Sequence, residues 1–351
     1  MAKPIAKIEA DLRGTRQTSA GPPASSSRSA VSRFWRRSLQ RAGTAAFVGS
    51  LVVRHGWPGT LLYYWVSPGD DMLLTALLHE MRLRGHRRVW LMTHNPELFQ
   101  DNRDVDVTLP FTPWLPAVGK RVRWNVVRPE YHTNVENLDC DIVDPGCHII
   151  TAMCRSIGLK GKIRLRPYIH LTPKEREEGR RVDRQITIQS SGLAGTTPMI
   201  TKQWFPERFA AVASALKDRF NFVQIGAAAD PQIPGAVDLR GKTTLRQSAA
   251  ILAESITFVG TVGFPMHLAR AVECRSVIVY GGREAPTQSG YRSNENLFTP
   301  LPCAPCWRRF TCPYDRECML KISPDVVVAA IERQAARFGT PLPIDEQLIA
   351  L

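Results

Sequence analysis

The chain has 351 residues, of which 44% are hydrophobic and 22% charged, and this composition is typical of a globular protein. Its length predicts about two domains. It contains no apolar run of about 18 residues or more, which argues against a transmembrane helix.

The net charge is +14 at pH 7, and more than half of it lies in residues 1–54, which hold ten Lys or Arg residues and two acidic residues. Such a segment can bind nucleic acid or an anionic membrane face, or can remain a solvated tail. Residues 14–32 are rich in Ser, Gly, Pro and Ala and are predicted to be disordered. Arg36 and Arg37 then precede a short apolar run, which has the pattern of an export signal but lacks an A-x-A cleavage site. We favour an amphipathic segment at a membrane surface.

Strands and helices alternate from Leu61 onward, with short apolar runs predicting strands and helical spacing of apolar residues predicting helices. The first series comprises strands at 61–67, 87–93 and 121–127, helices at 70–84 and 148–159, and a helix start at Pro96. The second comprises strands at 186–191, 222–226, 256–260 and 276–282 and helices at 206–220, 244–255, 265–273 and 324–338. This alternation predicts α/β domains with parallel sheets covered by helices on both faces.

The two series predict two Rossmann-like domains that face each other across a cleft. We place a basic, largely disordered extension at 1–55, the first domain at 56–160, a linker at 161–184, the second domain at 185–322, and a final helix and tail at 323–351. Ligands of open α/β sheets bind beyond the carboxyl ends of the strands. The loops at 67–71, 190–204 and 260–267 are therefore candidates for the site, and the Gly-rich loop 281–294 could line it.

Several motifs occur in an order that resembles glycosyltransferase family 9, the heptosyltransferase group. They are GDDMLLTALL at 69–78, KQWFPERF at 202–209, DLRGKTTLRQSAAIL at 238–252, VGTVGFPMHLARAV at 259–272 and the cysteine-bearing end at 303–322. The resemblance covers roughly residues 60 to 335. It implies a GT-B fold, with an acceptor domain at 56–160 and a nucleotide-sugar domain at 185–322.

The resemblance also implies an inverting sugar transfer that needs no divalent metal. The expected donor is a nucleotide sugar, ADP-heptose above all, and the expected acceptor is a glycan or glycolipid of the lipopolysaccharide type. We expect a cytoplasmic protein with peripheral contact to the anionic inner membrane, and no nucleic-acid partner. Three alternatives stay open: a protein acceptor such as an adhesin, a degenerate binding protein without catalysis, and a basic zinc-containing nucleic-acid binder.

Site residues follow from the matching motifs. Asp70 corresponds to the family's catalytic Asp and is the expected general base, although an Asp at a helix start can also serve as an N-cap and Asp71 competes for either role. Expected donor-binding residues are Lys202, which matches the family lysine, and Gly263, Met266 and His267 in the loop and helix start after a strand. Position alone adds Ser190, Ser191 and Asp230. Thr261 stands where the family often carries an Asp.

Four cysteines, Cys303, Cys306, Cys312 and Cys318, have the spacing C-x2-C-x5-C-x5-C. This clustering favours a structural zinc ion, or iron in its place, over reduced packing thiols or disulfides. Because the segment lies between the last core strand and the final helix, we expect it to hold that helix in place and to have no part in catalysis.

Overall fold

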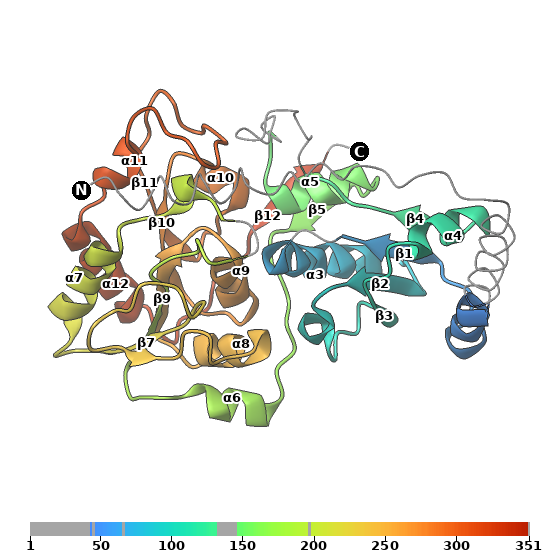
Figure 1. Ribbon diagram of the computed structural model, residues 1–351, viewed down its shortest axis with the longest axis horizontal. Helices are drawn as coiled ribbons and strands as arrows, with labels where there is room; N and C mark the ends of the chain where they lie inside the picture. The colour runs from blue at the N-terminus through green and yellow to red at the C-terminus, as the bar shows by residue number, and fades with distance from the viewer. Residues whose placement is uncertain (1–42, 44–45, 65–66, 132–145, 196–197, 350–351) are drawn as a thin grey trace, which may run out of the picture. The chain divides into compact units, whose positions relative to one another are not determined.

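A computed structural model describes residues 43, 46–64, 67–131, 146–195 and 198–349 (Figure 1). Residues 1–56 and 57–351 form two separate compact units. In the first unit residues 46–55 are helical. The predicted disordered stretch at 14–32 and the twin arginines lie outside the described residues. Among the described residues, no helix combines the length and apolar character that a membrane span requires.

The second unit begins with a parallel sheet of four strands in the order β3-β2-β1-β4 (Figure 1). The strands are β1 (Thr60–Tyr63), β2 (Val89–Thr93), β3 (Val107–Pro110) and β4 (Val126–Val127). Every residue of β2 is buried, as expected for an inner strand with both faces covered. The connecting helices are η1 (Pro96–Phe99), α4 (Leu115–Arg121) and α5 (Ile149–Ser156), of which η1 is a 3₁₀ helix.

The predicted strand at 121–127 is wrong over most of its length. Residues up to Arg121 belong to α4, and only Val126 and Val127 pair with β1. Pro116 lies in the first turn of α4, where its missing N–H costs nothing. The backbone of Arg123 then turns through a left-handed conformation, with φ of 63°, before the strand begins.

Helix α3 (Pro68–Leu83) follows β1 and places the first candidate site residues. Ser67 is its N-cap and accepts a hydrogen bond from the N–H of Asp70 at 3.3 Å, and Pro68 opens the helix. Its apolar side chains are buried on more than one side, because α3 packs against both α5 and the second domain's α9 (Phe264–Ala271).

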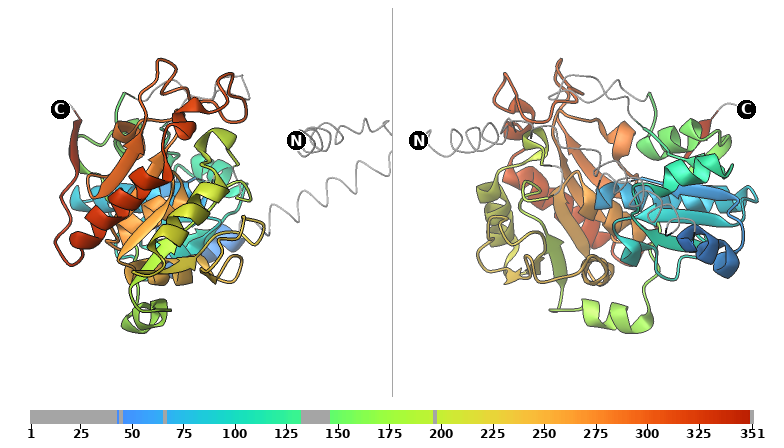
Figure 2. Two further views of the ribbon diagram at one scale, coloured as in Figure 1. Left: turned by 90° about the vertical axis from the view of Figure 1, so that its left-hand side faces the viewer. Right: turned by 45° about the vertical axis from the view of Figure 1, so that its right-hand side comes forward.

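The second sheet has six parallel strands in the order β11-β10-β9-β6-β7-β8. The strands are β6 (Gln185–Ile188), β7 (Asn221–Gln224), β8 (Val237–Asp238), β9 (Thr257–Thr261), β10 (Ser276–Tyr280) and β11 (Asn294–Phe298). The helices are η2 (Ile200–Lys202), α7 (Pro206–Leu216), α8 (Leu245–Ala253), α9, α10 (Pro286–Ser289), α11 (Glu317–Leu320) and α12 (Pro324–Ala336). Figure 2 shows helices on both faces of this sheet.

Alternation along β10 separates two apolar cores. Val277 and Val279 point to the face covered by α7 and α12, and Ile278 and Tyr280 point to the face covered by α8 and α9. The core on the α8 and α9 face continues without interruption into the side chains of α3 and α5 in the first domain. The two sheets are therefore joined through a shared apolar core.

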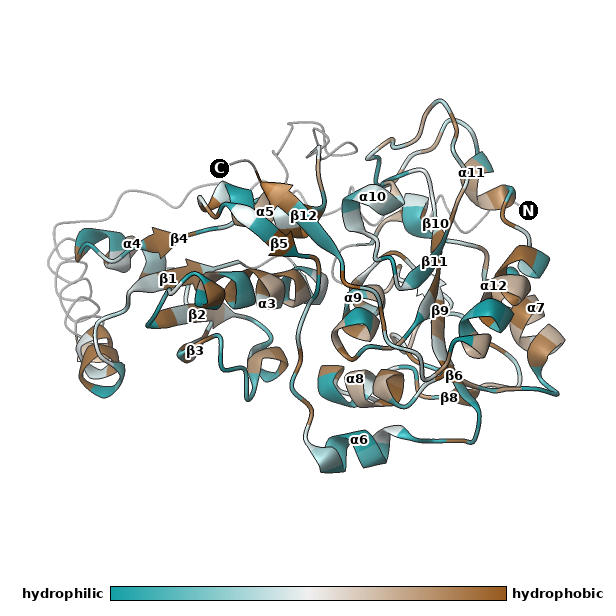
Figure 3. Cartoon of the chain, turned by 180° about the vertical axis from the view of Figure 1, so that it is seen from behind, coloured by the Kyte–Doolittle hydropathy of each residue, from teal (hydrophilic) through white to brown (hydrophobic). Residues whose placement is uncertain are grey.

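The chain crosses between the two domains more than once. Segment 161–184, predicted as a linker, contains β5 (Gly161–Arg164) and α6 (Pro173–Gly179), and β5 pairs antiparallel with the last strand, β12 (Glu346–Ile349). The hydrophilic α6 packs on α8, which carries hydrophobic residues (Figure 3). Arg246 of α8 binds the Glu175 carboxylate through two hydrogen bonds of 2.7 Å and holds its pKa down at about 2.

Candidate functional site

A cleft of about 470 Å³ lies at the carboxyl ends of the strands, and residues of both α/β domains line it. The first domain contributes the loop after β1 and the start of α3, together with Tyr131 and Ile149. The second contributes the loops after β6, β7, β9 and β10. This is the position at which open α/β sheets bind their ligands.

Asp70 lines the cleft although its side chain is almost entirely buried. One carboxylate oxygen, Oδ1, accepts a hydrogen bond from the Tyr131 hydroxyl at 2.8 Å, and Oδ2 accepts one from the Ser67 hydroxyl at 2.7 Å. The carboxylate is thus held in one orientation by two donors from different segments. Burial and the nearby Asp70 charge keep the pKa of Tyr131 well above its usual value, so this hydroxyl remains a donor.

Asp71 lies outside the cleft and has a structural environment. Its Oδ2 accepts hydrogen bonds from Thr93 Oγ1 at 3.0 Å and Asn95 Nδ2 at 2.7 Å, which ties α3 to the loop after β2. Burial raises the pKa of Asp71 to about 7, against the lowering effect of these two hydrogen bonds. Of the two neighbouring carboxylates, only Asp70 is placed to meet a substrate.

The N-terminus of α9 faces the cleft, and Gly263 and His267 both line it as the motif predicts. The helix start lies close to α3, since a Cβ added to Gly69 would be 3.6 Å from the Cα of Phe264. His267 Nδ1 is 2.7 Å from the Tyr291 hydroxyl. Burial, followed by the neighbouring His148, lowers the pKa of His267 to about 3, so the imidazole is neutral near pH 7. A neutral ring with Nδ1 facing a hydroxyl can carry its proton on Nε2.

Lys202, at the end of η2, lines the cleft and forms an ion pair with Glu284 from the loop after β10. Glu284 is 5% exposed. Burial acts to raise the pKa of Glu284, but Lys202, Ser289 and Arg283 together bring it down to about 2. An ionised, buried carboxylate beside a lysine is stable only while the pair remains intact.

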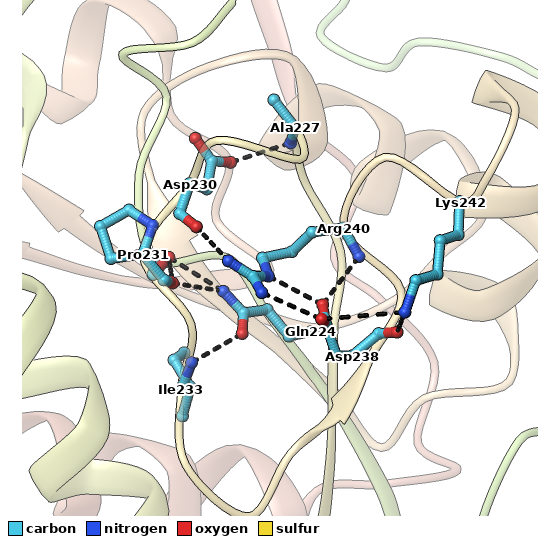
Figure 4. Close-up of polar contacts among 9 residues, drawn as sticks. Gln224, Ala227, Asp230, Pro231, Ile233, Asp238, Arg240 and Lys242 are labelled. Carbon is cyan, nitrogen blue, oxygen red and sulfur yellow. Dashed lines mark hydrogen bonds and ion pairs between the residues drawn. The ribbon is translucent and has the colours of Figure 1, made fainter.

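Asp230 also lines the cleft, after the end of β7 (Figure 4). Its Oδ2 accepts a hydrogen bond from the N–H of Ala227 at 2.9 Å, and Oδ1 is buried and has no hydrogen-bond partner among the residues that the structure describes. Gly226 precedes this turn with φ of 134°, and a Cβ there would lie 2.3 Å from Asp230 Oδ2. Gly226 is therefore required for this turn, which leaves one carboxylate oxygen for a ligand.

Three other predicted donor-binding residues are not in the cleft lining. Ser190 bonds to the Pro231 carbonyl at 2.5 Å and receives a bond from Gln224 Nε2 at 3.0 Å, which fixes the same turn. The Ser191 hydroxyl contacts Gln203 Oε1 at 3.2 Å. Met266 is fully buried beneath the Tyr280 hydroxyl. These side chains lie outside the cleft and stabilise the loops that line it.

The four cysteines of the segment 303–318 line a second, smaller cavity of about 290 Å³. Cys318 Sγ accepts a hydrogen bond from the N–H of Gly282 at 3.1 Å, and Cys312 Sγ accepts one from the N–H of Arg316 at 3.3 Å. Four thiols around one cavity fit a tetrahedral metal as a donor set. As placed in the described residues, however, no three His, Cys, Asp or Glu side chains converge closely enough to hold an ion.

The cysteine segment contacts the final helix and also borders the central cleft. Cys318 and Met319 do pack with α12, as expected of a segment that holds the final helix. Trp307 and Arg309, however, line the central cleft. The pattern of cysteines indicates a cluster but carries no information on which neighbouring side chains turn toward the cleft.

Residues 166–315, which cover most of the segment 161–184 and most of the second domain, match the family model for glycosyltransferase family 9 (heptosyltransferase). The chain resembles glycosyltransferase family 9. No curated protein sequence gives a significant match. The predicted class of enzyme, a glycosyltransferase, is confirmed by the family match.

Solved structures of several glycosyltransferases share the fold. The chain is similar to ADP-heptose lipopolysaccharide heptosyltransferase II of E. coli, with a TM-score of 0.60 and 15% identity over 79% of this chain and 98% of that one. For a family 9 glycosyltransferase of Veillonella parvula the TM-score is 0.59, with 14% identity over 79% and 97%. For the iron-containing dodecameric glycosyltransferase TibC of enterotoxigenic E. coli it is 0.61, with 17% identity over 80% and 76%. The predicted GT-B fold is thereby confirmed.

Several residues of the cleft were not singled out from the sequence, among them Tyr131, Arg283, Glu284, Trp307 and Arg309. For Arg283 and Glu284 a signal existed, because both follow β10 in the Gly-rich loop 281–294 that was expected to line the donor pocket. No local pattern distinguishes Tyr131 from an ordinary packing residue.

Proposed function

We propose that this chain transfers heptose from ADP-heptose to a glycan or glycolipid of the cell envelope, with inversion at the sugar and without a metal in the transfer step. The observation that carries the proposal is the Asp70 carboxylate, oriented by two hydroxyl donors and set in the same cleft as Lys202 and the N-terminus of α9. The TibC structure solved with ADP-D-beta-D-heptose supports this choice of donor.

Asp70 would act as the general base. An inverting transfer needs one base, which takes the proton from the acceptor hydroxyl as that oxygen attacks the sugar carbon from the side opposite the leaving group. Tyr131 and Ser67 hold the two carboxylate oxygens, so the proton would arrive at a group that is already oriented. Asp70 lies among the loops of the first domain that line the cleft, which supports an acceptor that enters the cleft from the first domain's side.

The leaving diphosphate would be stabilised from the second domain. A helix N-terminus favours negative charge, and Gly263 and His267 lie at that end of α9. His267 can donate from a neutral Nε2, and Lys202 supplies a positive charge that Glu284 holds in place. Together these groups would offset the charge that develops as the bond to the sugar breaks.

A panel of nucleotide sugars tests the donor. Purified protein is mixed with ADP-heptose, ADP-glucose, GDP-mannose, UDP-glucose and CMP-sialic acid, and its thermal stability and the release of free nucleotide are measured. We expect ADP-heptose to raise the melting temperature most and to release ADP when a suitable acceptor is added. Folded protein that binds none of these donors would contradict the proposal and would favour a non-catalytic role.

We also propose that the four cysteines of segment 303–318 hold a structural zinc or iron ion. The shared cavity and the two N–H···S hydrogen bonds support this, and TibC is described as iron-containing. Metal analysis of the purified protein should give about one ion per chain, and none in the Cys306→Ser, Cys312→Ser double variant. The buried Cys154, replaced by Ala, is the control that should keep the ion. A wild-type protein free of metal after purification without chelators would refute the assignment.

The basic segment 1–54 supports a peripheral position at the cytoplasmic face of an anionic membrane, where a lipid-linked acceptor would lie. Sedimentation with vesicles of anionic and of neutral lipid tests this. We expect binding only to anionic vesicles, weakened by salt and lost when residues 1–56 are removed. Equal binding to neutral vesicles would contradict it.

A further inference from the structure

The cysteine segment reaches the central cleft through alternate residues. Trp307 and Arg309 line the cleft, whereas Arg308 and Phe310 between and after them are exposed and lie outside its lining. Trp307 is 5% exposed, which is low for a tryptophan in a surface loop. The segment is therefore a wall of the cleft as well as a support for α12.

Hydrogen bonds fasten this wall to both chain segments that carry the buried ion pair. The Thr201 hydroxyl, next to Lys202, donates to the Arg308 carbonyl at 2.5 Å. On the other side, the N–H of Trp307 donates to the Arg283 carbonyl at 2.9 Å, and Arg283 Nη1 returns a bond to the Trp307 carbonyl at 2.5 Å. Trp307 is thus fixed beside Glu284, the residue that follows Arg283.

The backbone of Trp307 adopts a conformation that a bulky residue rarely takes. Its φ is 52°, in the left-handed region where glycine is favoured and other residues are strained. The conformation turns the indole inward, where the Arg283 guanidinium lies 5.5 Å from the ring centroid. An aromatic ring held in this way, beside cations in the lining, can pack on the face of a sugar while the cations bind its oxygens.

The sheet order separates this wall from the nucleoside end of the cleft. Asp230 follows β7 and Arg283 follows β10, and the order β10-β9-β6-β7 puts three strand spacings between them. That distance is about 14 Å at the usual spacing of roughly 4.8 Å. The α9 N-terminus, after β9, lies between these two ends. A nucleotide sugar with its nucleoside at Asp230 and its diphosphate at α9 would place its sugar at the β10 end.

We infer that Trp307 and Arg309 of the cysteine segment bind the transferred sugar of the donor and determine which sugar is accepted. This inference rests on the proposed function, because it assumes a nucleotide-sugar donor in the cleft. Trp307 would pack against the ring of the sugar, and Arg309 would donate hydrogen bonds to its hydroxyl oxygens.

Paired binding measurements on free ADP and on ADP-heptose test the inference. They use the full chain and its Arg309→Gln and Trp307→Phe variants, with Arg308→Gln as a matched control on the exposed neighbour. We expect Arg309→Gln to weaken ADP-heptose binding by about tenfold and Trp307→Phe by a few fold, while the affinity for ADP stays within about twofold. The control should bind both ligands as the wild type does.

The outcomes separate the two proposals. Equal loss of ADP and ADP-heptose binding in Arg309→Gln would overturn the inference, because it would place Arg309 at the diphosphate or indicate a general structural defect. Unchanged binding of both would also overturn it. If the wild type binds no nucleotide sugar at all, the proposed function fails, and the inference fails with it.

Discussion

At the residue scale, two adjacent carboxylates have opposite environments. Asp70 meets the cleft and accepts hydrogen bonds from Tyr131 and Ser67, whereas Asp71 is buried against Thr93 and Asn95. One turn of helix can therefore carry both a chemical group and a structural one. The sequence motif indicates that Asp70 is the residue that faces the cleft, and the different hydrogen-bond partners of the two carboxylates explain why.

Asp71→Asn tests the structural assignment through pH. Burial raises the Asp71 pKa from 3.8 to about 7, so between these values the folded protein holds a proton that the unfolded chain releases. The stability contribution of this group is full below about pH 4 and is lost as the pH rises through 7. The variant should therefore match the wild type in melting temperature near pH 4 and exceed it at pH 8. A difference independent of pH would contradict the assignment.

Lys202→Met tests the ion pair with Glu284. Removing the lysine leaves a buried carboxylate without compensation, which we expect to cost about 3 kcal/mol in the free energy of unfolding. Adding Glu284→Gln to the same protein should recover most of this loss, because the buried charge is then gone. Denaturant unfolding of the wild type and of the single and double variants gives the coupling free energy between Lys202 and Glu284. Additive losses in the double variant would show that the two side chains do not depend on each other.

At the level of helices and strands, the ends of the strands position the site. The positions of the inner strands and of the loops that line the cleft were predictable from the sequence. Apolar runs located the inner strands of both sheets, β1, β2, β6, β7, β9 and β10, but not the edge strands β3, β8 and β11. The rule for open α/β sheets located the loops of the cleft. Contacts between residues that lie far apart in the sequence could not be predicted. Nothing near Lys202 indicates Glu284 as its partner, since the two are joined only by the order of the strands. The strand predicted at 121–127 failed for a local reason, because a turn with Arg123 in the left-handed conformation follows α4 and delays pairing with β1 until Val126.

Gly226→Ala tests the turn after β7. The added Cβ meets both a left-handed backbone and the Asp230 carboxylate, so we expect a loss of about 2–4 kcal/mol in stability and weaker binding of ADP. Gly235→Ala is the matched control, because a φ of 79° gives the same backbone strain, while the added Cβ would have no atom of the described residues within 4 Å apart from its chain neighbours. It should cost about 1–2 kcal/mol and leave ADP binding unchanged. Equal effects of the two substitutions would contradict a role for the Asp230 turn in the site.

At the scale of the second compact unit, the two α/β domains are tied by a common core and by the returning carboxyl-terminal strand. Asp345, just before β12, faces Arg270 of α9, and both are almost fully buried. Composition and length predicted two domains but could not show that β12 returns to pair with β5, because antiparallel pairing over some 180 residues leaves no local signal.

Asp345→Ala tests this tie. The substitution leaves the Arg270 charge buried with its carboxylate partner removed, and we expect a loss of about 3 kcal/mol together with a single unfolding transition for both domains. Glu346→Ala is the control, because its ion pairs with Lys162 and Arg164 are long and exposed and should contribute less than about 1 kcal/mol. Two separate transitions in calorimetry would contradict the coupling of the domains.

Turnover by the Asp70→Asn variant tests directly whether Asp70 is the general base of the transfer. ADP release from ADP-heptose in the presence of acceptor is measured beside donor binding, with the exposed Asp218→Asn as the control. We predict that Asp70→Asn lowers kcat by about 10²–10⁴-fold while its affinity for the donor stays within a few fold. A variant that turns over at the wild-type rate would contradict the claim.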